Sequence, residues 1–235
     1  MNSSGRTVVV TGAGRGIGRA ASLRFARRGD RVVLAARSAD QLAETARAIG
    51  DESRCLTVAA DVSVEADTAR IMSEAVRRFG RIDVLVNNAG MAPLAPIERM
   101  DTATFDRMIA VNVRGLFLCC RAAWPHLRAA GGGVIVNISS RAASDPFPGF
   151  AAYGGSKAFV ETFTRALGAE GAAEGIRVFG VAPGAVATRM LLDLFPDFPR
   201  DKSLDPDEVS GLIEGLCDER FHACSGQTLG IARPE

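Results

Sequence analysis

This chain of 235 residues is poor in the residue types that build metal and disulfide sites. It has two histidines and five cysteines, and no two cysteines are spaced as Cys-x-x-Cys. A Cys/His metal site is therefore not expected, and we predict no bound metal. The simplest interpretation of the cysteines is that they are free thiols in a reducing compartment. They are Cys55, Cys119, Cys120, Cys217 and Cys224.

A strong net charge and long apolar segments are also lacking. The net charge of +1 gives no electrostatic reason to expect nucleic acid or an anionic membrane as a partner. No apolar run approaches the roughly 20 residues of a membrane-spanning helix. The first expected strand begins at Thr7, too early for a signal peptide to precede it. We therefore expect a soluble cytoplasmic protein.

Tyrosine is nearly absent as well, because Tyr153 is the only one in the chain. Lys157 follows it four residues later, and residues with this spacing share one face of a helix. A neighbouring ammonium group favours phenolate, so we expect the pKa of Tyr153 to lie below its ordinary value of about 10. Such a phenol can donate and accept a proton near neutral pH. A surface lysine beside a core tyrosine would show the same spacing, so the pair alone does not establish catalysis.

Short β-branched runs alternate with longer amphipathic patterns along the chain. The runs predict strands over 7–11, 31–36, 55–59, 84–87, 134–138 and 178–182. The amphipathic patterns predict helices over 17–29, 39–49, 64–79, 103–130 and 152–174. This alternation is typical of an α/β fold: a Rossmann-type doubly wound parallel sheet between two helical layers. No linker or repeat marks a boundary, so we expect residues 1–235 to form one domain.

Two stretches interrupt the alternation. Residues 141–151 form a loop with two prolines, and residues 189–206 contain three prolines and an apolar cluster. Both follow strands, at the edge of the sheet where parallel α/β folds bind ligands. We expect both stretches to line a pocket, with 189–206 acting as a lid over the substrate.

A glycine-rich turn follows the first expected strand. Gly12, Gly16 and Gly18 fit the spacing G-x-x-x-G-x-G. The commoner G-x-G-x-x-G does not fit, because Ile17 occupies its last position when counting starts at Gly12. Glycines permit a tight turn and a close approach of the backbone to a pyrophosphate, which binds at the helix N-terminus. A turn of this kind between a strand and a helix predicts a dinucleotide site.

The end of the second expected strand indicates which dinucleotide. An acidic residue at that end would contact the ribose of NAD, but Arg37 and Ser38 stand there, and Asp30 lies at the opposite end. Arg37 can form charge-assisted hydrogen bonds with a 2′-phosphate, and Arg15 in the glycine turn can add a second positive charge. We therefore predict NADP(H) as the cofactor. A solvated arginine at a strand end and a helix-capping serine are the structural alternatives.

Further motifs follow in order along the chain. They are Thr11-Gly12-x-x-x-Gly16-x-Gly18, Asp61-Val62, Asn87-Asn88-Ala89-Gly90, Asn112, Ser140, Tyr153-x-x-x-Lys157 and Pro183-Gly184-x-x-x-Thr188. With this spacing the chain resembles the short-chain dehydrogenase/reductase family, in its compact single-domain branch, over nearly its whole length. The resemblance implies hydride transfer between NADP(H) and a carbonyl/secondary alcohol pair. It also implies a homodimer or homotetramer.

The resemblance implies catalytic roles for four residues. Tyr153 would be the general acid/base, Lys157 would lower its pKa and hold the nicotinamide ribose, and Ser140 would bind the substrate carbonyl. Ser139 is the alternative, but the interval to Tyr153 fits the family better from Ser140. Asn112 would hold a water molecule that links Lys157 to solvent.

The other family positions would contact the cofactor. Asp61 and Val62 would meet the adenine, and Thr188 would help to orient the carboxamide. The remaining positions along the cofactor are Gly12, Ile17, Asn88, Ala89, Gly90, Pro183, Gly184 and Val186. Turn residues and strand ends are the structural alternatives for several of them.

The expected pocket walls are apolar: residues 91–94, the loop around Phe147 and Phe150, and residues 190–195. They predict a neutral, largely hydrophobic ketone or aldehyde as the substrate. Two alternatives stay open: an NAD-linked alcohol dehydrogenase of the same fold, and a protein that senses NADP(H) without turnover. Three features depart from the family pattern: Arg141 directly after Ser140, two glycines inside the last long helix, and a C-terminus without Asp-Gly-Gly.

Overall fold

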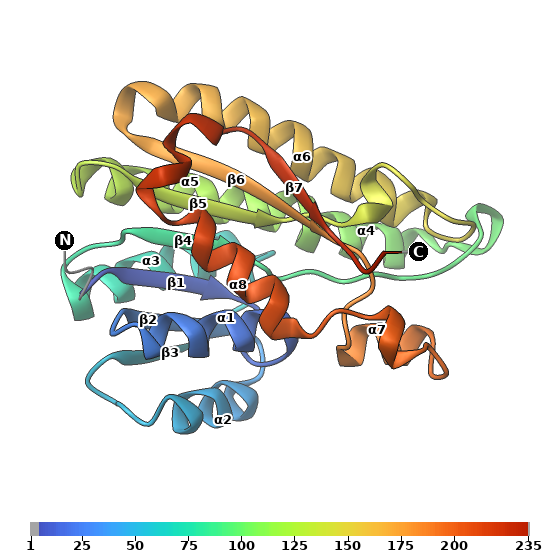
Figure 1. The fold of residues 1–235 in the computed structure, drawn as a ribbon, viewed down its shortest axis with the longest axis horizontal. Coiled ribbons are helices and arrows are strands. Elements are labelled where there is room, and N and C mark those ends of the chain that lie inside the picture. The colour runs from blue at the N-terminus through green and yellow to red at the C-terminus, as the bar shows by residue number, and fades with distance from the viewer. Residues whose placement is uncertain (1–4, 235) are drawn as a thin grey trace.

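The computed structural model describes residues 5–234, in which seven parallel strands form one sheet. The strands are β1 (Thr7–Thr11), β2 (Arg31–Ala36), β3 (Cys55–Ala59), β4 (Val84–Asn87), β5 (Gly133–Ile138), β6 (Ile176–Pro183) and β7 (Thr228–Ile231). Their order across the sheet is β3-β2-β1-β4-β5-β6-β7, so successive strands are added toward one edge up to β3 and toward the other edge from β4 on (Figure 1). The strand order thus reverses between β1 and β4. Ligands bind outside the carboxyl ends of the strands at such a point.

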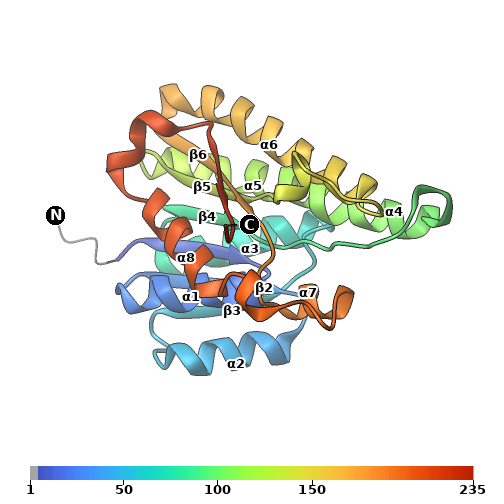
Figure 2. The same cartoon turned by 45° about the vertical axis from the view of Figure 1, so that its right-hand side comes forward.

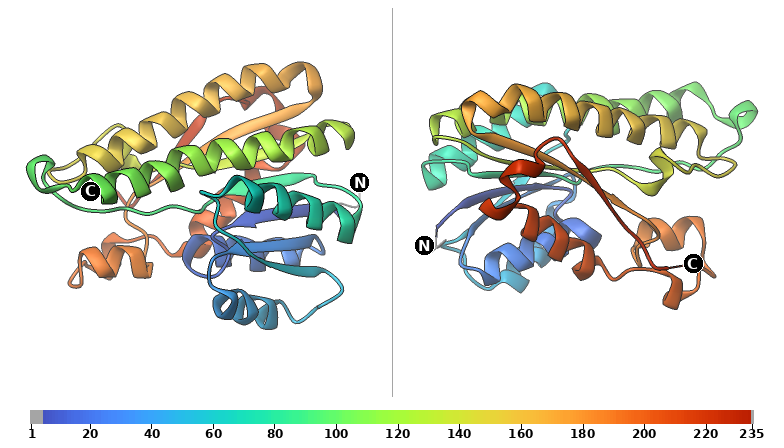
Figure 3. Two further views of the ribbon diagram at one scale, coloured as in Figure 1. Left: turned by 180° about the vertical axis from the view of Figure 1, so that it is seen from behind. Right: turned by 45° about the horizontal axis from the view of Figure 1, so that its top comes forward.

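Helices cover both faces of the sheet, which confirms the predicted Rossmann-type fold. Helices α1 (Gly16–Arg27) and α8 (Pro206–Leu216) are seen in front of the sheet in Figure 1. Helix α2 (Ala39–Ile49) is seen below them and contributes Leu42 to the same core. The opposite face, shown on the left of Figure 3, is covered by α3 (Glu65–Phe79), α5 (Leu116–Ala129) and α6 (Ala151–Gly171). Two shorter helices, α4 (Thr102–Ile109) and α7 (Arg189–Leu194), belong to connections at the edge of the sheet.

Alternating side chains of the strands supply two separate cores. Val8 and Val10 of β1 belong to the core under α1, α2 and α8, which includes Phe25 and Ile213. Val9 belongs to the core under α3, α5 and α6. Successive side chains of a strand point to opposite faces, so the continuous apolar run of β1 fills both cores.

Helices α7 and α8 and strand β7 were not predicted from the sequence. Helix α8 begins with a capping box, in which Asp205 accepts from the backbone of the first turn and Glu208 accepts from the backbone N–H of Asp205. Strand β7 is four residues long and lies at the edge of the sheet. The predicted helix over 103–130 is interrupted, because a π-helical turn (Ala110–Gly115) separates α4 from α5.

The two irregular stretches lie at the carboxyl edge of the sheet, as predicted. The 141–151 stretch begins with a 3₁₀ turn, Arg141–Ala143. The 189–206 stretch contains α7 and a second 3₁₀ turn, Arg200–Lys202, and projects beyond the sheet (Figure 2). Its two ends are joined, since the backbone N–H of Leu204 donates to Ala185 O (2.9 Å) and that of Ala187 donates to Leu204 O (2.8 Å). Among residues 5–234, no helix has the length and apolar character needed to cross a membrane.

Candidate active site

The glycine turn leaves an open backbone surface at the N-terminus of α1. Gly12 and Gly16 have left-handed φ angles of +66° and +54°, which favour glycine. A Cβ atom on Gly18 would lie 2.3 Å from Gly12 O, so only glycine fits there. Arg15 precedes the helix without capping it, and the first turn has no acidic residue. The free N–H groups and the helix dipole therefore suit the phosphates of a dinucleotide.

Thr11 and Asn88 fasten this turn to the end of β4. The Thr11 hydroxyl donates to Val86 O (3.3 Å) and accepts from the backbone N–H groups of Asn88 and Ala89 (both 3.1 Å). The side-chain amide of Asn88 donates to Thr11 O (3.0 Å) and Gly12 O (3.2 Å). Sequence reasoning gave Thr11 no role of its own. Its place at the end of a strand, directly before Gly12, was the available signal.

The residues predicted to meet the ribose and adenine lie around the ends of β2 and β3. Arg15 and Arg37 are exposed, and Ser38 accepts from the backbone N–H of Gln41 as the cap of α2 (3.4 Å). Burial acts to raise the pKa of Asp61, but hydrogen bonds from Ser63 and the positive charge of Arg37 outweigh it, so this pKa lies below its ordinary value.

Val62 and Asn112 have their side chains within the protein. Val62 is buried and packs beside Gly115, where a Cβ atom would lie 2.9 Å from its Cγ2 atom. Asn112, in the π-helical turn, accepts from Met91 N (2.9 Å) and donates to Met91 O (2.9 Å) and Ser156 Oγ (3.1 Å). Its amide thus joins the segment after β4 to α6.

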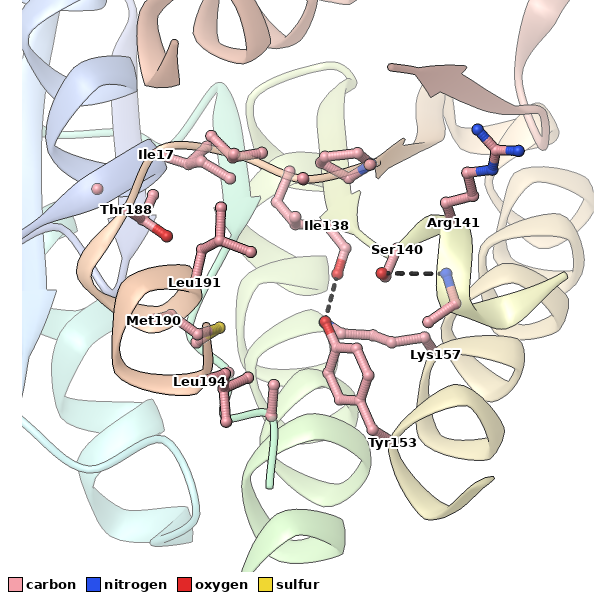
Figure 4. A pocket seen from close by; sticks show the side chains of 18 of the residues that line it. Ile17, Ile138, Ser140, Arg141, Tyr153, Lys157, Thr188, Met190, Leu191 and Leu194 are labelled. Atoms are coloured by element: carbon pink, nitrogen blue, oxygen red, sulfur yellow. Dashed lines mark hydrogen bonds between the residues drawn. The ribbon is translucent and has the colours of Figure 1, made fainter. Parts of the chain in front are cut away.

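Tyr153, Lys157 and Ser140 come together from two elements. Ser140 follows β5, and its hydroxyl accepts from the backbone N–H of Ala142 (3.2 Å). Tyr153 and Lys157 both lie on α6, and the ammonium nitrogen is 5.8 Å from the centre of the phenol ring. Lys157 Nζ donates to the carbonyl oxygen of Ile138 (2.8 Å). Figure 4 shows the three side chains on one side of a pocket, facing Thr188 and Leu191 on the other.

The expected direction of the Tyr153 pKa shift was wrong. Burial raises the pKa of Tyr153, although a hydrogen-bonding interaction with the Ser140 side chain acts in the opposite direction. Burial also lowers the pKa of Lys157 to about 8. In both cases the cause is lost hydration, because burial disfavours the charged form of either group. The phenol of Tyr153 therefore keeps its proton at neutral pH.

Ser139, the alternative to Ser140, has its hydroxyl engaged elsewhere. It is buried and lies 3.1 Å from both Lys157 O and a carboxylate oxygen of Glu161. Both acceptors belong to α6, so Ser139 ties the end of β5 to this helix. The Ser140 hydroxyl is the one that acts on Tyr153.

A cavity of about 550 Å³ joins the glycine turn to the Ser140–Tyr153–Lys157 group. Predicted cofactor residues that line it are Gly12, Arg15, Gly16, Ile17, Asn88, Ala89, Gly90, Pro183, Gly184, Val186 and Thr188. Gly18, Arg37, Ser38, Asp61, Val62 and Asn112 do not belong to its lining among the described residues. The cavity therefore corresponds to the half of the site where the nicotinamide and the substrate are expected.

Apolar side chains from three segments form the outer walls of the cavity. They are Met91 and Ala92 after β4, Phe147 and Phe150 in the 141–151 stretch, and Met190, Leu191, Leu194, Phe195 and Phe198 in the lid. The expectation was wrong for Pro93, Leu94, Leu192 and Asp193, which are not among its described lining residues. In the lid, the helical spacing of α7 turns 190, 191 and 194 inward and leaves Leu192 outside.

The charged residues at the mouth of the cavity form ion pairs. Arg141 lies 3.4 Å from Asp145, and Arg189 lies 3.5 Å from Asp193. Each pair joins residues four positions apart, and all four side chains are largely exposed. Arg141, the departure from the family pattern, therefore contributes to the rim. The walls offer few groups that could pair with a charged substrate.

Comparison with known proteins agrees with this geometry. A family model described as short chain dehydrogenase matches residues 6–197. The 2-(R)-hydroxypropyl-CoM dehydrogenase of Xanthobacter autotrophicus is 44% identical over 192 residues, which are 79% of this chain and 76% of that protein. The 3beta-hydroxysteroid dehydrogenase 1 of Eggerthella lenta is 37% identical over an alignment that covers 97% of this chain and 92% of that protein.

A solved structure is similar throughout. It is a 3-ketoacyl-(acyl-carrier-protein) reductase from Brucella melitensis complexed with NADH, with a TM-score of 0.91, 34% identity and coverage of 97% of both chains. The family model extends over the glycine turn and the Ser140–Tyr153–Lys157 group alike. The chain therefore belongs to the short-chain dehydrogenase/reductase family of oxidoreductases, which use a nicotinamide cofactor on alcohols and ketones.

Proposed function

We propose that this protein reduces neutral, largely hydrophobic ketones or aldehydes to alcohols with NADPH, and catalyses the reverse oxidation with NADP⁺. The observation that carries the proposal is the placement of Ser140, Tyr153 and Lys157 on one wall of an otherwise apolar cavity that begins at the glycine turn. A binding protein that only senses the cofactor would not need a proton donor at this position.

The chain supplies the proton and the stabilisation of charge. The nicotinamide, when bound, supplies or accepts the hydride. Tyr153 donates its proton to the carbonyl oxygen, and Ser140 donates a hydrogen bond to the same oxygen as negative charge develops there. A positioned acid typically contributes about 10²–10⁴-fold to the rate. Reduction requires a protonated phenol, and Tyr153 keeps its proton at neutral pH.

Lys157 and Asn112 support the proton donor in this proposal. Lys157 holds the ribose hydroxyls of the cofactor, and Asn112 positions a water molecule that connects the ammonium group with solvent. The proximity of the two side chains supports this assignment. A Cβ atom on Gly90 would lie 3.4 Å from Asn112 Oδ1 and 3.6 Å from Lys157 Nζ. Both polar atoms thus approach the backbone of Gly90 from one side.

The choice of NADP(H) rests on Arg37 and Arg15. Both are exposed beside the predicted ribose site, and no acidic residue ends β2. The Arg37 charge also lies close enough to lower the pKa of Asp61. NAD(H) is the second candidate, because the similar reductase from Brucella melitensis was solved with NADH.

Cofactor binding by fluorescence titration separates these two possibilities. We expect NADPH to bind more tightly than NADH, and Arg37→Asp to reduce the difference by roughly 10–150-fold, as the loss of a charge-assisted contact implies. Arg47→Asp is the matched control, because Arg47 is exposed in the last turn of α2 and carries the same charge change. Equal affinities of the wild type for the two cofactors would rule out the role of Arg37.

An apolar substrate is supported by the cavity walls and by one relative. The outer walls hold nine apolar side chains from three segments, and Arg141 and Arg189 at the rim are paired with carboxylates. The Eggerthella lenta relative is named for a hydroxysteroid. NADPH consumption against a panel of neutral, anionic and sugar-like carbonyl compounds, with NADH in parallel, tests the proposal. A clear preference for anionic or sugar-like compounds would contradict it.

We also propose that the protein is a homodimer or homotetramer. Phe105 of α4, Phe117 of α5 and Phe159 of α6 are 37–41% exposed. Phe163 joins two of them, with a stacked contact to Phe159 and an edge contact to Phe117. Burial of these rings against a second copy would remove apolar surface from water. A monomeric mass by light scattering at micromolar concentration would contradict this proposal.

One domain and a cytoplasmic location complete the proposal. One sheet takes its strands from residue 7 to residue 231, which supports a single domain over the chain. All five cysteines are free thiols, and burial raises the pKa of Cys119 to about 12. A thiol buried in this way is unreactive. Their number without a disulfide supports a reducing compartment.

A further inference from the structure

A row of five aromatic rings runs along one wall of the cavity. In order, the aromatic row consists of Phe198, Phe195, Phe147, Phe150 and Tyr153. The distances between successive ring centres are 6.4, 5.9, 4.4 and 5.0 Å. The row therefore extends from the lid, through the 141–151 stretch, to the phenol that acts as proton donor in the proposed function.

Phe147 occupies the point in this row where the two segments meet. It contacts Phe150 of its own stretch and Phe195 of the lid. Its side chain is 46% exposed, whereas Phe150 is 7% exposed. A ring that lines a cavity and keeps this much apolar surface in water gains by contact with an apolar ligand.

The backbone holds the Phe147 ring in place before a ligand arrives. Pro146 and Pro148 flank the residue, and proline fixes its own φ angle. The backbone N–H of Phe150 donates to Phe147 O (3.0 Å), and that of Ala95 donates to Gly149 O (3.1 Å). Preorganisation of this kind reduces the entropy lost on binding.

We propose that Phe147 is a specificity-determining residue, which favours ketones with a flat aromatic ring next to the carbonyl over saturated ketones of equal size. The inference rests on the proposed function, because the carbonyl must be held by Tyr153 and Ser140. The Phe150 ring adjoins the phenol, and the Phe147 ring adjoins Phe150. A ring attached to a carbonyl at the phenol therefore lies within reach of both.

Ring electronics supply the discrimination. Aromatic rings attract one another in offset and edge-to-face arrangements with centres about 4.5–7 Å apart, beyond the effect of buried area. A cyclohexyl group has similar size but no such quadrupole, and it is thicker than a flat ring. The aromatic row already spaces its members over this range, so a further flat ring can extend the same packing.

Acetophenone and cyclohexyl methyl ketone form a matched pair for the test. The ratio of kcat/KM for the two ketones is measured for the wild type, Phe147→Leu and Phe79→Leu. Phe79, the last residue of α3, is absent from the described cavity lining and receives the same change. The two ketones differ in intrinsic reactivity, but this difference cancels when the ratio of one protein is divided by that of another. Phe147→Leu should reduce the preference for acetophenone about two- to tenfold, and Phe79→Leu should leave it unchanged.

Binding without turnover separates the inference from the proposed function. The dissociation constant of each ketone is measured by calorimetry on the same three proteins, and the ratio should change as the kinetic ratio does. If the wild type binds acetophenone preferentially but reduces neither ketone, the proposed function fails and the role of Phe147 stands. If turnover is normal but Phe147→Leu keeps both ratios, the role of Phe147 is overturned. The role of Phe147 is also overturned if the wild type binds neither ketone.

Discussion

Gly154 and Gly155 are neighbours on α6, yet the structure predicts opposite effects of the same substitution. A Cβ atom on Gly154 would lie 2.5 Å from Ala142 O and 3.1 Å from Pro146 Cβ. At Gly155 no atom of the described chain lies within 4 Å of the added carbon, and the residue is exposed. Glycine inside a helix costs about 1 kcal/mol relative to alanine, so either substitution gains that amount from the backbone.

Gly155→Ala should therefore raise the free energy of unfolding by about 1 kcal/mol, which corresponds to a Tm increase of roughly 2–4 °C for a chain of this size. Turnover should not change. In Gly154→Ala, the helix and the Ala142 carbonyl must separate by about 1 Å to reach an ordinary contact. Forced packing of this kind costs roughly 1–3 kcal/mol, so the backbone gain is offset and the net effect is a loss of up to about 2 kcal/mol.

The same displacement reaches the proposed active site. Ala142 belongs to the turn whose backbone N–H donates to Ser140 Oγ. A shift of about 1 Å in a catalytic group can lower the rate by about a hundredfold, so we expect kcat/KM of Gly154→Ala to fall by roughly tenfold to a hundredfold. Thermal unfolding and steady-state reduction of one ketone, measured on both variants, are the assays. Equal stability and activity of the two variants would refute the reasoning, as would a loss of stability in Gly155→Ala.

Three further predictions concern the phenol, the ammonium group and the lid. Tyr153→Phe should lose at least about 10²-fold in kcat while its affinity for NADPH, measured by fluorescence, changes little; retention of a tenth of the wild-type rate would exclude Tyr153 as the acid. Burial lowers the pKa of Lys157 from 10.5 to about 8, and between these values the unfolded chain binds the proton that the folded chain lacks. The stability of the wild type relative to Lys157→Met should therefore rise by about 3 kcal/mol between pH 8 and pH 10.5 in denaturant titrations, and a flat difference would contradict the shift. Leu191→Ala and Leu194→Ala should raise KM for a hydrophobic ketone, whereas Leu192→Ala, outside the described cavity lining and 43% exposed, should not; equal effects of all three would exclude α7 as a wall.

The fold could be predicted wherever the local pattern and the tertiary environment agreed. Strands β1, β2 and β4 are largely buried apolar runs, and the observed bounds of β1 to β4 are the predicted ones. Strand β7 has four residues, one of them a glycine, and only pairing with β6 at the edge of the sheet makes it a strand. The interruption between α4 and α5 was invisible, because the apolar pattern continues through the π-helical turn.

The site residues could be placed from the sequence, but their electrostatics could not. The motifs fix the positions of Ser140, Tyr153 and Lys157 along the chain, and the structure brings all three into one cavity. The direction of the Tyr153 pKa shift depends on the burial of the phenol and on its hydrogen bond with Ser140, which are properties of the folded chain. The contact between Phe147 and Phe195 joins residues 48 positions apart, so no local pattern announces it.

The pinned base of the lid has a consequence for how this protein can change over evolution. Residues 185–187 and Leu204 hydrogen-bond to each other, so the segment between them leaves the sheet and returns at nearly the same point. Closing a longer loop between fixed ends costs only about 0.6 kcal/mol for each doubling of its length. The segment can therefore be lengthened, shortened or exchanged as a cassette while the strands, the glycine turn and the proton donor keep their places. A change of this one segment can therefore alter the substrate while the residues of the proposed active site stay unchanged.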